Sequence, residues 1–263
     1  MSMQKSLPKV AASASGQIDF GRIRRWMFDQ ALPIWAERGI DREHGGFLEE
    51  LTPDAKPTSC TFKRVRVICR QIYVFAHAST LGWSQGAALA DLGFVYLRDH
   101  TRLADGGWAR RLARDGVIID STPDLYDISF VIFALAWRYR ISPDAHVLAL
   151  AHETLDYIQQ KMRAPHGGFW HALPPQGSRV QNPHMHLVEA CHAAFEATGE
   201  RRFLEQADEV VGLLCTKFFD GVTVGEFFNE DWTRQKSEAG RPLEPGHQFE
   251  WAWILSTHQR LKG

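Results

Sequence analysis

The sequence predicts an all-α protein made of about four helical hairpins, and two observations carry that prediction. The first is a series of long apolar stretches at helical spacing, with few and short strand candidates such as residues 116–120. The second is an internal repeat: a di-glycine followed by an aromatic residue begins at Gly45, Gly106 and Gly167, so both spacings are 61 residues. Hairpin repeats cannot bury their apolar faces alone, so they stack or close into a ring.

Eight helices are expected, two in each repeat. They cover residues 18–38, 64–80, 85–100, 123–141, 145–163, 184–198, 202–219 and 247–262. Residues 121–124 read as a helix start with proline in the first turn, and Gly82 and Gly199 follow helices as stop residues. We interpret the di-glycine turns as tight connections within hairpins, where glycine adopts backbone angles that other residues avoid.

Composition places few limits on the fold and excludes several partners. With 263 residues, 44% of them hydrophobic, the chain can bury a large core, and we expect one domain over residues 18–263 after a flexible segment 1–17. A net charge of −1 gives no reason to expect nucleic acid or an anionic membrane. No apolar run has membrane-spanning length and no signal peptide is evident, so we expect a cytoplasmic protein. The four cysteines form neither a disulfide framework nor a zinc motif.

The second predicted helix carries a polar stripe with spacings of 4, 3 and 4 residues, formed by Arg66, Arg70, Tyr73 and His77. The rest of that helix is largely apolar, so it is expected to be buried on most sides. Arg66 has two possible roles, as the partner of a core carboxylate or as a ligand-binding residue. For Arg70 the ligand-binding role is favoured.

The same pair of residue types opens the sixth and the eighth predicted helices. Asn182, His186 and Glu189 share one stripe of the sixth, and His247 and Glu250 repeat the His-x-x-Glu spacing in the eighth. The histidines are 61 residues apart, and so are the glutamates. Equivalent points of adjacent hairpins in a ring face one axis, so both pairs are expected to face one cavity.

A neutral histidine is the natural proton acceptor near pH 7. A glutamate one turn away can accept the other ring N–H and thereby fix the tautomer. A metal site built from His184, His186 and His247 is the competing interpretation. Histidines two residues apart on a helix point in different directions, so we expect no metal and a structural role for His184.

Three segments resemble the N-acylglucosamine 2-epimerase family, which includes mannose isomerases and cellobiose 2-epimerases: residues 69–75 (CRQIYVF), 182–190 (NPHMHLVEA) and 245–253 (PGHQFEWAW). The resemblance extends over nearly the whole chain. It implies an (α/α)6 barrel whose inner ring consists of the even-numbered helices. It also implies proton transfer at C2 of an open-chain sugar through an enediolate, with a small sugar as partner and without a cofactor or a metal.

The resemblance also implies roles for single residues. His247 resembles the base that acts on the C2 proton, and Glu250 resembles its supporting carboxylate. Arg70 resembles the arginine that holds the substrate oxygens, which suits a guanidinium because it offers a planar fork of donors that stays charged. Trp251, one turn from His247, is the tryptophan that we expect to offer an aromatic face to the sugar.

Four other side chains are expected to contact the sugar. Asn182 and His186 resemble sugar-contacting positions, and His186 resembles a residue that assists ring opening. Tyr126 matches a further contact on the fourth predicted helix. Glu189 is grouped with them because it shares the stripe of His186.

The chain is shorter than its family resemblance requires. Six hairpins at this period need about 366 residues, and the chain supplies about 4.3 repeats, so an incomplete toroid is expected. The resemblance places a second catalytic histidine in the absent part. His258 is the candidate that remains, and it lies about 16 Å from His247 along the same helix. We therefore expect weak activity, and we expect possible homodimerisation through exposed apolar faces.

Three functions stay open from sequence. The first is an aldose–ketose isomerase or a 2-epimerase that acts on a mannose-like or glucosamine-like sugar. The second is a weakly active or inactive sugar-binding or protein-binding remnant of the same fold. The third is an inverting glycosidase, which would need two carboxylates about 6.5–9.5 Å apart, drawn from Asp127, Glu189 and Glu250.

Overall fold

The computed structural model describes residues 18–235 and 243–263, so the predicted flexible segment 1–17 lies outside the described residues. All eight predicted helices are present in these ranges. The first consists of three consecutive segments, α1 (Phe20–Trp26), η1 (Met27–Ala31) and α2 (Leu32–Arg38). The next four are α3 (Val65–Thr80), α4 (Gly86–Thr101), α5 (Leu125–Ile141) and α6 (Ala145–Lys161). The last three are α7 (Asn182–Thr198), α8 (Arg201–Leu213) with its extension η2 (Leu214–Phe218), and α9 (Pro245–Lys262).

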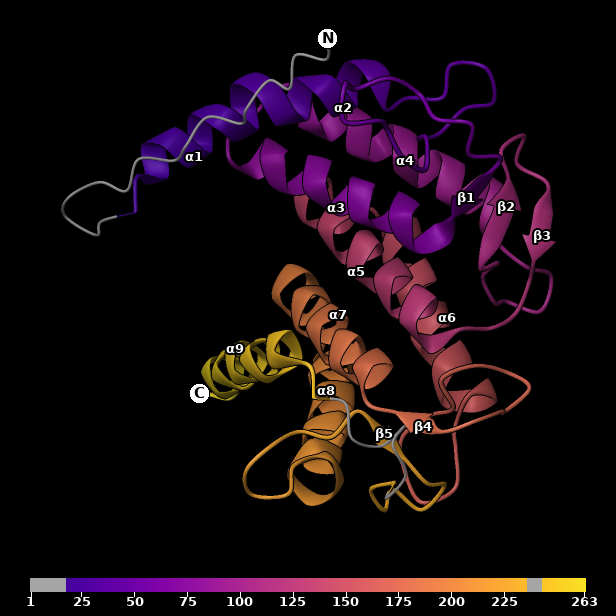
Figure 1. The fold of residues 1–263 in the computed structure, drawn as a ribbon, viewed down its shortest axis with the longest axis vertical. Helices are drawn as coiled ribbons and strands as arrows, with labels where there is room; N and C mark the ends of the chain where they lie inside the picture. The colour runs from indigo at the N-terminus through magenta and orange to yellow at the C-terminus, as the bar shows by residue number, and fades with distance from the viewer. Residues whose placement is uncertain (1–17, 236–242) are drawn as a thin grey trace, which may run out of the picture.

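The helices form two layers that follow an arc (Figure 1). In the inner layer α3 packs against α5, α5 against α7, and α7 against α9. In the outer layer α4, α6 and α8 cover α3, α5 and α7 in turn. This alternation confirms the predicted array of helical hairpins, with every second predicted helix on the inside.

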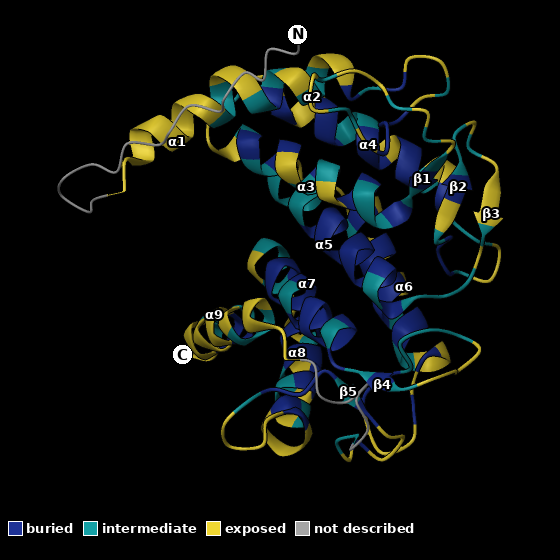
Figure 2. Ribbon diagram, in the orientation of Figure 1, coloured by how far each residue is buried: buried dark blue, intermediate teal, exposed yellow. Residues whose placement is uncertain are grey.

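The centre of the arc is the most buried part of the molecule (Figure 2). Residues 127–136 of α5 are all buried, because the helix has α3 on one side, α7 on the other and α6 behind it. A helix in such a place needs apolar side chains all round, whereas an outer helix needs a single apolar stripe. The fourth predicted helix is correspondingly the most uniformly apolar of the inner set.

The predicted helix boundaries follow local backbone chemistry. The Asp124 carboxylate accepts hydrogen bonds from the backbone N–H groups of Tyr126 and Asp127 and so caps α5. Gly199 ends α7 with a φ of 75°, in the left-handed region that glycine adopts without strain.

The di-glycine turns lie in a different place from the predicted one. They do not connect the two helices of a hairpin. Each follows an outer helix and begins a long connection to the next inner helix. There the turn folds back in a β-bridge, and the aromatic residue after it is inserted into the core, with Phe47, Trp108 and Phe169 no more than 1% exposed. The repeat therefore marks a buried anchor between hairpins.

Two small antiparallel sheets stand where inner helices begin. β1 (Phe62–Arg64), β2 (Arg111–Ala113) and β3 (Ile118–Asp120) pair in that order, and β1 runs directly into α3. β4 (Arg179–Val180) pairs with β5 (Phe227–Phe228), and β4 leads into α7. None of the described helices combines the length and the apolar character needed to cross a bilayer.

Candidate active site

Side chains from three adjacent inner helices meet at Arg70, Tyr126 and His186. The Arg70 guanidinium on α3 donates a hydrogen bond from Nη2 to the Tyr126 hydroxyl on α5, at 2.5 Å. The Tyr126 ring meets the His186 ring on α7 nearly at a right angle, with centroids 4.7 Å apart. Arg70 is exposed, so the guanidinium retains donors that can hold the oxygens of a polar ligand.

His186 lies between two carboxylates. Its Nδ1 is 3.1 Å from Glu189 Oε2, one turn along α7, and 3.8 Å from Glu250 Oε1 on α9. The 3.1 Å contact confirms the predicted pairing of His186 with Glu189. Carboxylates accept hydrogen bonds, so in the neutral ring the proton belongs on Nδ1 and Nε2 is left as an acceptor.

His247 is held by a different carboxylate from the predicted one. Its Nδ1 lies 3.0 Å from both oxygens of Glu226, a residue of the loop before α9. The prediction that Glu250 supports His247 is therefore wrong, because Glu226 already occupies Nδ1 and Glu250 points toward His186. Sequence reasoning missed Glu226, since positions 165 and 104, one and two repeats earlier, are proline and alanine.

The prediction that Trp251 offers an aromatic face to a sugar is also wrong. Its side chain is 1% exposed. The indole N–H donates to Gln181 Oε1 at 2.7 Å, and the ring packs against Phe218 of η2 with centroids 6.5 Å apart. A stacking residue needs an open face, and packing between α9 and η2 leaves none.

Asn182 is the first residue of α7 and is half-buried. Its Oδ1 is buried and has no hydrogen-bond partner among the described residues. A buried amide oxygen without a donor is costly. Because this oxygen is closed to solvent, the expected contact between Asn182 and a sugar stays a prediction.

Comparison with known proteins identifies the family. The family model described as N-acylglucosamine 2-epimerase (GlcNAc 2-epimerase) matches residues 45–263. The chain belongs to this family. The mannose-6-phosphate isomerase of Rhizobium meliloti (strain 1021) is 36% identical over 250 residues, which cover 92% of this chain and 64% of that protein. The D-mannose isomerase of Thermobifida fusca is 30% identical over 213 residues, covering 72% and 51%. The chain thus spans less than two thirds of the length of these relatives.

Solved structures of the family share the fold. The cellobiose 2-epimerase from Spirochaeta thermophila DSM 6192 superposes with a TM-score of 0.84 at 26% identity, covering 92% of this chain and 63% of that one. A D-mannose isomerase superposes with a TM-score of 0.82 at 24% identity, covering 91% and 64%. These matches confirm the all-α toroid architecture that the resemblance implies.

In this member of the epimerase family, Glu189 and Glu250 converge on one imidazole. One ligand atom from each of these carboxylates and one from His186 lie within 4.8 Å of one another, a set that could hold a divalent cation. That closeness argues against an inverting glycosidase built on the two glutamates, because such enzymes need about 6.5–9.5 Å between their carboxyl groups.

The third carboxylate considered for glycosidase chemistry, Asp127, joins α5 to α3. Its Oδ1 accepts the backbone N–H of Arg66 at 3.2 Å, and its Oδ2 lies 3.5 Å from Arg66 Nη1. Burial, reinforced by the nearby Asp124 charge, raises the pKa of the Asp127 carboxyl to about 7. Arg66 therefore pairs with a core carboxylate, which was one of its two expected roles.

The structural role predicted for His184 is confirmed. Its Nε2 accepts the Phe169 N–H at 3.0 Å, its Nδ1 lies 3.1 Å from the Val180 carbonyl oxygen, and burial lowers its pKa to about 3. The metal site that combined His184 with His186 and His247 does not form, because His184 faces the core.

His258 is likewise occupied away from the site. Its Nε2 lies 2.9 Å from Asp208 Oδ1 on α8, and its Nδ1 lies 2.9 Å from His192 Nε2 on α7. The side chain is buried and ties α9 to both helices. His258 is thus unavailable as the second catalytic histidine, as its distance along the helix predicted.

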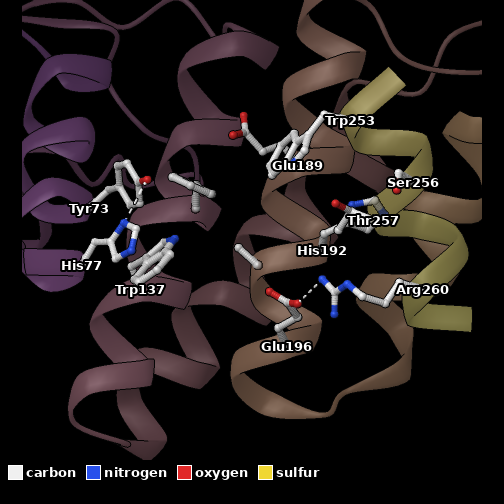
Figure 3. Close-up of a pocket in the computed structure, with 12 residues that line it drawn as sticks. Tyr73, His77, Trp137, Glu189, His192, Glu196, Trp253, Ser256, Thr257 and Arg260 are labelled. Atoms are coloured by element: carbon white, nitrogen blue, oxygen red, sulfur yellow. Dashed lines mark hydrogen bonds and ion pairs between the residues drawn. The ribbon is translucent and has the colours of Figure 1, made fainter. Parts of the chain in front are cut away.

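A cavity of about 480 Å³ lies further along the same inner helices (Figure 3). Tyr73, His77 and Trp137 line one wall, and Trp253 and Arg260 line the other. Glu189, the partner of His186, also lines it. The inner surface therefore has two zones, the histidine site at the helix starts and this cavity toward their ends, and Glu189 belongs to both.

Proposed function

We propose that this chain catalyses proton transfer at C2 of an open-chain aldose, as an aldose–ketose isomerase or a 2-epimerase. The observation that carries the proposal is the pair of imidazoles, His186 and His247, which stand 61 residues apart on inner helices that pack together. Each ring has its Nδ1 beside a carboxylate, so each offers Nε2 as a proton acceptor. Arg70 adds a permanent positive charge on the same inner surface.

The proposed reaction begins when His247 Nε2 removes the C2 proton. The electron pair of the C2–H bond then forms the C1=C2 bond of an enediolate, and the negative charge passes to O1. The Arg70 guanidinium stabilises that charge, because its donors stay ionised at all working pH values. For the ketose, the O2 proton moves to O1, the His247 imidazolium returns its proton to C1, and the C1=C2 electron pair forms the new C1–H bond as C2=O2 forms. For the epimer, an acid on the opposite face gives its proton to C2, the O1 charge re-forms the aldehyde, and His247 keeps the proton that it removed until solvent takes it.

Binding of the sugar falls to the neighbouring side chains. The half-buried Asn182 side chain contacts a sugar hydroxyl after a small rotation that uncovers its amide oxygen, and the Tyr126 hydroxyl, fixed by Arg70, contacts another. His186 assists ring opening by exchanging a proton with the ring oxygen or the anomeric hydroxyl. Glu189 keeps its imidazole oriented during that exchange.

A mannose-type aldose is the proposed substrate. The support comes from relatives named as isomerases of mannose or of its 6-phosphate, at 36% and 30% identity. A relative named as a cellobiose 2-epimerase, from Bacteroides fragilis, is 24% identical.

The test is exchange of the C2 hydrogen of D-mannose in D₂O, followed by NMR together with formation of fructose and glucose. We expect exchange in the parent chain and a loss of about 10²–10⁴-fold in His247→Ala. His146→Ala, at an exposed histidine on the outer helix α6, is the matched control and should exchange like the parent. Equal exchange in both variants would remove His247 from the mechanism. No exchange by the folded parent would favour the sugar-binding remnant instead.

We also propose that two copies associate through the ends of the arc. Large apolar side chains are exposed on α1 and α9, among them Phe20 (73%), Trp26 (55%), Phe249 (78%) and Trp253 (56%). Sedimentation equilibrium should give a dimer that Trp26→Glu weakens, and a monomer at all concentrations would contradict this. A single domain over residues 18–263 and a cytoplasmic location remain predictions.

A further inference from the structure

A small sheet places two polar residues, Gln181 and Glu226, beside the Nδ1 atom of the proposed base His247. β4 and β5 pair Arg179 with Phe228 and Val180 with Phe227. The next step of that ladder brings Gln181 opposite Glu226, and the Gln181 N–H donates to the Glu226 carbonyl oxygen at 3.3 Å. Both side chains are buried, at 0% and 3% exposure. The ladder thus sets where the Glu226 backbone lies, and burial confines the side chain that extends from it.

The Glu226 carboxylate determines which nitrogen of His247 carries the proton. Both of its oxygens lie 3.0 Å from His247 Nδ1. The Gln181 amide nitrogen, a donor, also lies 3.3 Å from Nδ1, but it is closer to Glu226 Oε2, at 2.9 Å. The two shorter contacts of Nδ1 are with a carboxylate, which only accepts hydrogen bonds, so in the neutral ring they favour a proton on Nδ1 and a lone pair on Nε2. Among the described residues His247 is also the only ionisable cation-forming group within 4.0 Å of this carboxylate. Losing that bond would leave a buried charge with less compensation.

Trp251 determines the orientation of Gln181. An indole N–H can only donate, so the Gln181 atom 2.7 Å from Trp251 Nε1 must be Oε1. The Gln181 amide nitrogen then faces Glu226 Oε2 and donates to it at 2.9 Å. The hydrogen bonds thus run from Trp251 through Gln181 to Glu226. Gln181 holds one oxygen of the carboxylate, and His247 Nδ1 lies beside both of its oxygens.

We propose that Glu226 is the positioning residue that fixes the tautomer of His247, with Gln181 and Trp251 holding the carboxylate in place. Glu226 does not contact the sugar. It keeps Nε2 unprotonated and directed away from the buried side, and it stabilises the imidazolium that forms when His247 accepts a proton. This gives buried Trp251 a role in place of the expected sugar contact. The predicted effect on exchange rests on the proposed function, whereas the tautomer itself does not.

The tautomer is measured directly by long-range ¹H–¹⁵N NMR of the histidine rings, with His247→Gln to assign the signals. We expect a protonated Nδ1 and an unprotonated Nε2 in the parent chain. Glu226→Gln places an amide opposite the Gln181 amide and should mix the two tautomers. Glu226→Asp, which keeps the charge, should restore Nδ1 protonation in part. Glu230→Gln, at an exposed carboxylate of the same loop, is the matched control.

Exchange of the D-mannose C2 hydrogen is the second readout. Glu226→Gln should slow it about 10- to 100-fold and move the pH dependence of the rate, as expected for loss of a group that orients an imidazole. A change that only loosened the fold would leave the pH dependence unmoved. Trp251→Phe, which frees Gln181 to rotate, should give a smaller loss in the same direction.

The outcomes separate the two proposals. An unchanged His247 tautomer in folded Glu226→Gln, or a parent ring protonated at Nε2, overturns the positioning role. The expected tautomers without any exchange in the parent chain support the positioning role and count against the proposed function. Exchange that responds equally to Glu226→Gln and Glu230→Gln also overturns the inference.

Discussion

Replacing Gly46 by alanine tests the di-glycine turn, because two separate costs meet there. Gly46 has a φ of +64°, and an added Cβ would lie 2.6 Å from Cγ and 2.8 Å from both Cδ atoms of the Tyr96 ring. That ring is restrained, since His100 stacks on it with centroids 4.4 Å apart and the Lys63 ammonium lies 4.7 Å from its centre. Left-handed backbone costs an L-residue about 1–2 kcal/mol, and overpacking costs about 1–3 kcal/mol. The expected loss of unfolding free energy is therefore about 2–5 kcal/mol.

Gly82→Ala is the matched control. Gly82 has a φ of +91°, and an added Cβ there meets no atom of the described residues within 4 Å. Only the backbone cost remains, so the expected loss is about 1–2 kcal/mol. Urea unfolding followed by far-UV circular dichroism measures both variants. With a slope of about 3 kcal/mol per molar urea, the midpoint should fall by about 0.7–1.7 M for Gly46→Ala and by about 0.3–0.7 M for Gly82→Ala. Equal shifts in the two variants would show that Tyr96 yields and would refute the reasoning.

Four further predictions follow from burial and charge. Burial lowers the pKa of His192 to about 4, below the unfolded value of about 6.5, so the stability it contributes is present above pH 6.5 and is lost as the pH falls toward 4. That loss is about 3 kcal/mol, and an acid series of urea midpoints should be flatter in His192→Gln. Cys215 is exposed and should react at once with a thiol reagent, whereas Cys69 and Cys191 are buried, which raises their thiol pKa, and should react only on unfolding. Phe169→Ala should cost about 3–5 kcal/mol in urea unfolding, because the ring is fully buried. Sugar exchange, if it needs no metal as the resemblance implies, should be unchanged by EDTA.

The helices were predictable because their signals are local. The apolar periodicity and the stop at Gly199 each depend only on residues within one helix and its ends. All eight helices therefore lie close to their predicted ranges. The repeat also placed His186 and His247 on inner helices, since equal spacing in a stack of hairpins means equivalent positions. The position of the di-glycine turns was not predictable in this way. A glycine pair shows that backbone freedom is needed and does not show which side of a hairpin needs it.

The hydrogen-bond partners within the site could not be predicted from the sequence. Glu226 lies in an irregular loop and has no counterpart one repeat earlier, so neither periodicity nor spacing marks it. Its place depends on the pairing of β4 with β5, two-residue strands that are too short to leave a pattern. Trp251 was misjudged for a related reason. Whether a tryptophan stacks on a ligand or packs inside depends on its neighbours, here Gln181 and Phe218.

The two His-x-x-Glu pairs share a spacing and differ in their hydrogen-bond and ion-pair partners. Glu189 binds the histidine of its own helix, whereas Glu250 reaches back across the helix interface toward His186. His186 consequently lies beside two carboxylates, and His247 depends on a loop carboxylate that is itself fixed by a neutral amide. A repeat can copy backbone positions, but a side chain binds whichever partner the local packing places nearest. These different partners support the different parts that the proposed function gives the two imidazoles, His186 at ring opening and His247 at the C2 proton, although the sequence presents them as equivalents.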